Sequence, residues 1–138
     1  EHAGTAFVGD TGGIRVVGDY VIAPTPPPDI NIEDWQESLN IIDAWRPVSL
    51  FLTHFGPITP ARAHLARFRT ILTAQANAVR DALQAGGSEE EKIRRFVEHM
   101  RAEARKALPE REARATELAA PFDQLWQGLA RYWQKRSS

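Results

Sequence analysis

FVGDTGGIRV, residues 7–16, contains the turn around which the first part of this chain is organised. Its short apolar run ends at Gly9-Asp10, and Thr11-Gly12-Gly13 then supplies the residues of a tight turn. The pattern predicts a strand that carries one carboxylate, that of Asp10, to its carboxyl end. An aspartate in such a turn often bonds the backbone amides beside it, so turn chemistry is the alternative to a ligand role.

A second stretch, LFLTHFG at residues 50–56, repeats this arrangement with an imidazole. The nearly all-apolar residues 48–53 predict a strand buried on both faces, followed by His54. Ligands gather at the carboxyl ends of strands in α/β proteins, so Asp10 and His54 are expected to converge on one site. Carboxylate and imidazole together suit zinc, iron or manganese, whereas a lone histidine after a strand is also a common structural residue.

Around these stretches the pattern predicts an α/β chain with about four short strands followed by helices. Segments rich in β-formers at 14–17 and 20–23 flank the turn pair Gly18-Asp19, and a proline-rich connector follows at 24–28. The ranges expected to be helical are about 32–45, 61–85, 89–107 and a final segment divided at Pro121. We see no internal repeat.

The last helical segment carries a wide apolar stripe at spacings of three and four residues. The stripe consists of Phe122, Leu125, Trp126, Leu129 and Trp133. Core packing is the expected role of these side chains, and a self-association surface or a substrate lid is the alternative.

Composition and charge exclude several function classes. The chain has 138 residues, no cysteine and a formal net charge of −1, which excludes disulfide scaffolds and thiolate zinc sites and gives no reason to expect nucleic acid as a partner. Residues 1–60 hold eight acids and two arginines, and this acidic part suits a cation site, although solvated carboxylates produce the same balance. No apolar run approaches the ~20 residues of a membrane span, so we expect no membrane partner and a cytoplasmic location.

Taken together, FVGDTGGIRV, PTPPPDI at 24–30, the tryptophan-bearing helix and LFLTHFGP at 50–57 resemble the C-terminal half of a metallo-β-lactamase-fold hydrolase. The resemblance covers about residues 3–60 and implies one half of an αββα sandwich followed by a helical C-terminal extension. It implies two divalent transition-metal ions, zinc first and iron or manganese as alternatives, with Asp10 as the bridging ligand and His54 on the second metal. The implied reaction is attack of a metal-bound hydroxide on an ester, amide, thioester or phosphoester. Candidate residues of the pocket rim are Thr11, Gly12, Tyr20 and Phe55.

The family's His-x-His-x-Asp-His cluster does not occur in this sequence, so most of the implied ligands are missing. Because the chain begins at Glu1 rather than methionine, we expect it to be the second part of a longer enzyme and inactive alone. We expect residues 1–87 to belong to the hydrolase domain and residues 88–138 to form the helical extension. The expected partners are the N-terminal half of the same protein or a second copy of this chain, with a small-molecule substrate in the whole enzyme. The alternative is a non-catalytic interaction and oligomerisation module that retains the hydrolase framework.

Two further histidines are expected to have no role in metal binding. His64 lies near the start of a predicted helix, beside Leu65, and is interpreted as a surface or packing residue. His99 lies among charged residues and is interpreted as a solvated helix position.

Overall fold

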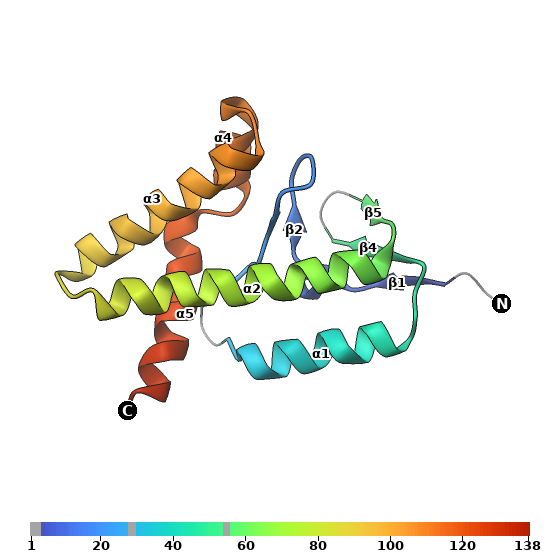
Figure 1. Cartoon of the computed structure of the whole chain (residues 1–138), viewed down its shortest axis with the longest axis horizontal. Helices are drawn as coiled ribbons and strands as arrows, with labels where there is room; N and C mark the ends of the chain where they lie inside the picture. Colours follow the sequence, from blue (N-terminus) through green and yellow to red (C-terminus); the bar gives the residue numbers. More distant parts are fainter. Residues whose placement is uncertain (1–3, 28–29, 54–55) are drawn as a thin grey trace.

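Five short strands, one 3₁₀ helix and five α-helices follow one another in the part of the chain that the structure describes (Figure 1). The computed structural model describes residues 4–27, 30–53 and 56–138. The strands are β1 (Thr5–Phe7), β2 (Ile14–Arg15), β3 (Val21–Ile22), β4 (Ser49–Leu52) and β5 (Gly56–Ile58), and the 3₁₀ helix η1 (Gly9–Gly12) follows β1. The helices are α1 (Ile32–Ala44), α2 (Ala61–Gln84), α3 (Glu89–Ala107), α4 (Glu110–Ala119) and α5 (Phe122–Arg136). The predicted α/β class is confirmed, and β5 and η1 are additions to the predicted elements.

The larger sheet has β4 at its centre, parallel to β1 and antiparallel to β5. Its register pairs Phe51 with Phe7 on one side and with Pro57 on the other. Leu50 and Leu52 are buried, whereas Phe51 is 39% exposed, so the prediction of a strand buried on both faces is wrong. The physical reason is that α1 and α2 both pack against the face that carries the two leucines.

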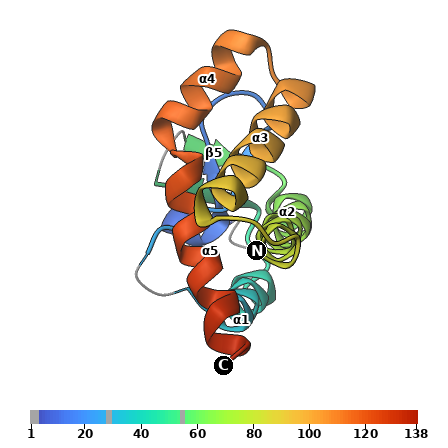
Figure 2. The same ribbon diagram turned by 90° about the vertical axis from the view of Figure 1, so that its left-hand side faces the viewer.

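Helix α2 runs through both hydrophobic cores of the molecule (Figure 1). Its first half contributes Leu65, Phe68 and Leu72 to a core shared with α1 and the larger sheet. Its second half contributes Ala76 and Val79 to a core shared with α3, α4 and α5. Figure 2 looks nearly along α2 and shows α5 crossing beside it, with α3 and α4 above.

Local signals in the sequence set the helix ends. The side chain of Asn31 accepts hydrogen bonds from the first-turn amides of α1, and Ser88 and Glu91 form the predicted capping box of α3. Pro121 precedes α5, as predicted. Within α5, Phe122, Leu125, Trp126 and Leu129 are each at most 3% exposed, so their expected role in the core is confirmed.

Several hydrogen bonds tie α5 to the first part of the chain. The Thr25 hydroxyl donates to the Leu125 carbonyl at 2.9 Å, and the Tyr132 hydroxyl donates to the Glu33 carboxylate at 2.8 Å. Gly128 allows the first of these contacts, because a Cβ at this position would lie 2.2 Å from the Thr25 carbonyl oxygen. The helical extension is thus docked on the preceding residues, and the division at residue 87 stays a prediction.

Candidate functional site

The parallel pairing of β1 and β4 brings the two predicted ligand stretches to one edge of the sheet. The Val8 amide donates to the Phe51 carbonyl at 3.1 Å, directly after the Phe7–Phe51 pair. Farther on, Gly9 lies beside Thr53, because a Cβ built on Gly9 would be 3.4 Å from the Thr53 Oγ1 atom. Asp10 follows this glycine, so it lies just beyond the end of β1, close to the residue that follows β4.

His54 and Phe55 lie outside the described residues. Their part in a site with Asp10 therefore stays a prediction. What the described residues establish is that β1 and β4 are parallel neighbours, so that both strands end on the same side of the sheet.

Asp10 occupies the second position of η1, and its side chain is exposed. Backbone hydrogen bonds close the turn around it: the Thr11 amide donates to the Val8 carbonyl at 3.2 Å, and the Gly13 amide donates to the Asp10 carbonyl at 3.0 Å. Residues 9–13 are called the Asp10 loop below. The loop thus places an exposed aspartate directly beyond the end of β1.

The glycines of the Asp10 loop are required by close packing. A Cβ on Gly12 would lie 2.6 Å from the Leu52 side chain, and Gly12 itself is buried. Gly13 has a φ of +92°, and a Cβ there would lie 2.7 Å from the Phe68 ring. The predicted turn is confirmed, and its glycines also let the loop sit directly on the sheet and on α2.

Two helices hold the carbonyl groups of the Asp10 loop. The Trp35 indole of α1 donates to the Thr11 carbonyl at 2.9 Å, and the His64 Nε2 atom of α2 lies 2.7 Å from the Gly12 carbonyl oxygen. Because a carbonyl oxygen only accepts, this contact requires the proton of His64 on Nε2. The loop is therefore fixed from both helices that cover the sheet.

His64 is buried, with its ring parallel to that of Phe68 at a centroid distance of 6.4 Å. Burial lowers its pKa below 6.5; the hydrogen bond to Gly12 opposes this effect, and the charges of Arg15 and Arg67 add to it. The neutral imidazole is therefore favoured. The packing interpretation of His64 is confirmed, and the surface interpretation is wrong.

The roles of Trp35 and His64 in holding the loop are missing from the sequence interpretation. One signal was present for the histidine: His64 and Phe68 are four residues apart, which places them on the same face of a helix. The partner carbonyl, 52 residues away, is not visible in any local pattern.

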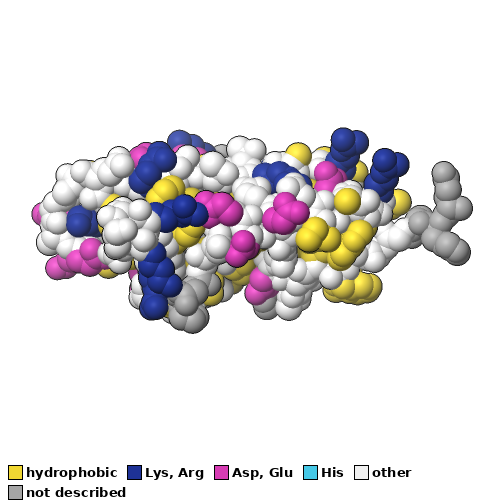
Figure 3. Space-filling view, turned by 90° about the horizontal axis from the view of Figure 1, so that it is seen from below, with side chains coloured by type: hydrophobic (Ala, Val, Ile, Leu, Met, Phe, Trp, Pro, Cys, Tyr) yellow, Lys and Arg dark blue, Asp and Glu magenta, His cyan; other side chains and the backbone are white. Residues whose placement is uncertain are grey.

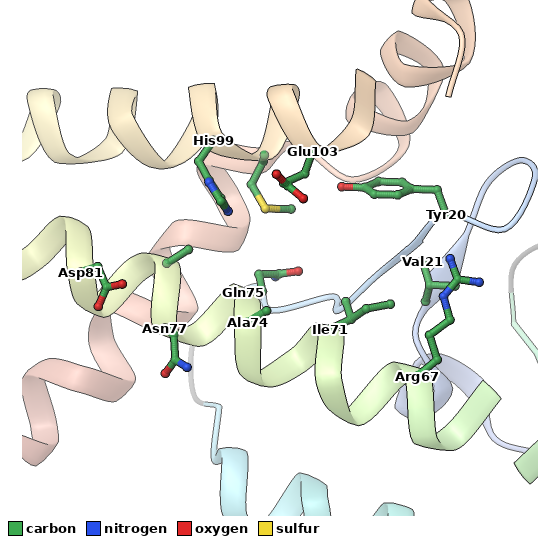
Figure 4. Close-up of a pocket in the computed structure, with 12 residues that line it drawn as sticks. Tyr20, Val21, Arg67, Ile71, Ala74, Gln75, Asn77, Asp81, His99 and Glu103 are labelled. Atoms are coloured by element: carbon green, nitrogen blue, oxygen red, sulfur yellow. The ribbon is translucent and has the colours of Figure 1, made fainter. Parts of the chain in front are cut away.

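Tyr20, a predicted rim residue, lines a cavity formed with α2 and α3 (Figure 4). Burial and the nearby charge of Glu103 raise the pKa of Tyr20 to about 12. The phenol is therefore protonated and neutral at physiological pH. The other described rim candidates, Thr11 and Gly12, belong to the Asp10 loop and do not line this cavity.

The described residues by themselves do not fit the dinuclear centre that the family resemblance implies. Within residues 4–27, 30–53 and 56–138, no group of three or more His, Cys, Asp or Glu side chains could hold a metal ion. Asp10 would supply a single carboxylate, and one carboxylate does not complete the coordination of a metal ion. Further ligands would have to come from His54 or from another protein segment.

Comparisons with protein-family models, with curated protein sequences and with solved structures gave no match for this chain. Over the described ranges, no helix combines the length and the apolar character that crossing a membrane requires.

Proposed function

We propose that this chain is the C-terminal part of a metal-dependent hydrolase with a metallo-β-lactamase-like αββα fold, and that Asp10 and His54 are metal ligands. The observation that supports the proposal is the parallel β1–β4 pair, because the carboxyl ends of parallel neighbouring strands lie on the same side of a sheet. Two bound metal ions, zinc first, would supply the activation of water for hydrolysis of an ester, amide, thioester or phosphoester. A cytoplasmic location belongs to the same proposal.

The construction of the Asp10 loop supports a ligand role for its carboxylate. The carbonyls of Thr11 and Gly12, directly after Asp10, are held by donors from the covering helices, Trp35 and His64. A ligand side chain needs such a supported backbone, because a metal site tolerates little displacement of its ligands. An aspartate in a simple surface turn needs no such support.

The exposed face of the larger sheet supports a second half that completes the fold. Phe7 and Phe51 lie side by side on this face, with ring centroids 5.2 Å apart and exposures of 79% and 39%. Pro57 of β5 is the register partner of Phe51 on the other side, so Phe7, Phe51 and Pro57 form a row across the three strands. An αββα sandwich covers such a face with a second sheet, which would also bring the missing ligands.

Exposed apolar side chains also lie around the end of α1 that leads to β4. They are Ile41, Trp45 and Val48. Figure 3 shows hydrophobic side chains gathered toward the end of the molecule where the N-terminal residues lie. Exposed apolar side chains gathered at one end of a molecule support an interaction site there.

Metal binding at Asp10 tests the proposal. We expect a titration of the ¹⁵N-labelled chain with Co²⁺, a paramagnetic substitute for zinc, to broaden the amide signals of residues 9–13 first. The Asp10→Ala variant should lose this response, because the carboxylate is gone. The matched control is Asp19→Ala, which removes another exposed aspartate that follows a glycine in a turn. An equal response in wild type and Asp10→Ala contradicts the ligand role.

The second candidate function is a non-catalytic module that associates with itself through the exposed sheet face. The Phe7–Phe51 row favours it, because two copies could cover each other's apolar faces without any metal. Light scattering of the chain at high concentration distinguishes this module from a strict monomer. A dimer that forms without metal, together with no Co²⁺ response at Asp10, favours the module over the hydrolase.

A further inference from the structure

A cavity of about 460 Å³ lies between α2, α3 and the start of β3 (Figure 4). This volume is within the range of small-molecule binding pockets, about 300–1,000 Å³. The walls come from residues on both sides of the predicted division at residue 87: Tyr20 from the segment before β3, Ile71 and Ala74 from α2, and Met100 from α3. None of the Asp10 loop residues lines it, so the cavity is separate from the proposed metal site.

The floor of the cavity is apolar and preformed. Val21 and Met100 are buried beneath it, and Ile71 and Ala74 add further apolar surface. Gln75 fixes α2 to the chain after β3, because its amide donates to the Ala23 carbonyl at 2.8 Å and accepts from the Ala23 amide at 3.3 Å. A ligand can therefore bind without breaking the hydrogen bonds between Gln75 and Ala23.

The two carboxylates of the cavity have cationic neighbours outside its lining. Lys106 contacts the Glu103 carboxylate at 2.6 Å, and Arg80 contacts that of Asp81 at 3.2 Å. Arg67 is different, because its guanidinium has no hydrogen bond or ion pair with any described residue. It extends from α2 toward Val21 at one end of the cavity (Figure 4) and also lines a second cavity of about 210 Å³ next to His64.

Tyr20 covers the cavity without adding charge. Its ring reaches over the space between the two helices, toward Glu103 of α3 (Figure 4). The phenol is neutral at physiological pH, so it does not repel an anion. Among the described residues, the charged group of the cavity that lacks a partner is therefore the Arg67 guanidinium, which lies at one end of the cavity.

We propose that this cavity binds a small amphipathic carboxylate. The aliphatic body of the ligand lies on Ile71, Ala74 and Met100, and its carboxylate pairs with Arg67. An apolar floor with a cation at one end fits this class of molecule by both shape and charge. The inference is independent of the metal proposal, because it uses neither Asp10 nor His54.

Octanoate and octanamide are the probes, because they share one chain and differ in charge. We expect octanoate to shift the NMR signals of Tyr20, Ile71 and Met100 in a saturable titration. The Arg67→Gln variant should weaken octanoate binding about tenfold through the loss of a charge-assisted contact. The same substitution should leave the weaker binding of octanamide unchanged.

Two further variants separate this site from general effects. Arg62→Gln is the matched control, because Arg62 is an exposed arginine on the same helix that does not line the cavity. Ala74→Phe places an aromatic ring on the exposed floor position and should abolish binding of octanoate. Circular dichroism checks that each variant keeps its helices.

Three results would overturn the proposal. The first is the absence of a saturable response up to ~10 mM octanoate, because the binding free energy would then be weaker than about −3 kcal/mol. The second is an equal loss of affinity in Arg67→Gln and Arg62→Gln. The third is binding of octanamide as tight as that of octanoate, because the carboxylate would then have no partner.

Discussion

The two halves of α2 lie in different surroundings. The second half is enclosed by α3 and α5, where the whole stripe from Phe122 to Leu129 is buried. The first half lies under one face of a sheet whose other face exposes Phe7 and Phe51. The helical part thus completes its own core within this chain. The sheet part keeps an apolar face with two exposed phenylalanine rings, and this is the face on which the proposed partner would pack.

Truncating one large side chain in each core gives the largest expected effect and tests whether the two parts unfold together. Phe68→Ala removes a fully buried ring from the core under the sheet, and Leu129→Ala removes a fully buried side chain from the helical core. We expect each variant to lose about 2–5 kcal/mol of unfolding free energy. Because α2 belongs to both cores, each variant should still unfold in one transition in urea, with circular dichroism and tryptophan fluorescence coinciding.

Two separate transitions would contradict this coupling. If Leu129→Ala unfolded the helices at low urea while the sheet core persisted, residues 88–138 would be an independent unit. That outcome would support the predicted division at residue 87. Coinciding transitions would instead show that the helical extension and the sheet part stabilise each other.

Acid should weaken the attachment of the Asp10 loop to α2, with a smaller effect than core truncation. The pKa of His64 is lowered in the folded protein, chiefly by burial, so its neutral form contributes stability above the ordinary value of 6.5. This stability is lost as the pH falls through the lowered folded-state value. His64→Gln keeps an N–H donor for Gly12 without this titration, so its unfolding free energy should fall less than that of wild type between about pH 7.5 and 5.

The exposed histidine of α3 provides the control for this measurement. His99→Gln removes an exposed histidine from α3 and shows what the loss of a histidine outside the Asp10 loop does to the same measurement. Thermal unfolding at several pH values compares the three proteins. The same pH dependence in His64→Gln as in wild type would contradict the role of the buried imidazole.

The smallest effect on stability is expected on the uncovered face of the sheet. Phe51→Ser should lower the unfolding free energy of the monomer by about 1 kcal/mol, less than core truncation, because the ring is 39% exposed and its partner on this face is the Phe7 ring. The same variant should reduce any self-association measured by light scattering. Leu118→Ser is the control, because Leu118 is 83% exposed on α4, outside the sheet.

A loss of several kcal/mol in monomeric Phe51→Ser would mean that this face is covered within one chain. The contrast between the two parts of the molecule would then disappear. Reduced association in Phe51→Ser but not in Leu118→Ser would assign the contact to the sheet face.

Most helices and turns were predictable because their signals are local. The Asn31 cap, the Ser88–Glu91 capping box and the break at Pro121 each act within a few residues of the helix end that they define. The turn of the Asp10 loop was likewise predictable from its glycines. What the pattern did not reveal was the support of this loop by Trp35 and His64.

The burial of β4 was predicted wrongly for a physical reason. Ser49, Leu50, Phe51 and Leu52 read as a strand, but composition does not tell how many faces of a sheet are covered. That depends on the side to which α1 and α2 return, and both return to the same side. A strand rich in apolar residues can therefore expose an aromatic ring in a single chain. The same ring can be buried when a second chain covers that face.

The sequence alone determined the α/β class, most of the helix ends and the turn that contains Asp10, because these depend on periodicity and turn chemistry over a few residues. Only the tertiary structure decided that β1 and β4 pair in parallel, that His64 reaches Gly12 across 52 positions, and that Arg67 lies at one end of a cavity between helices. Such contacts join residues far apart in the chain. They arise from the packing of whole elements, which no local pattern specifies.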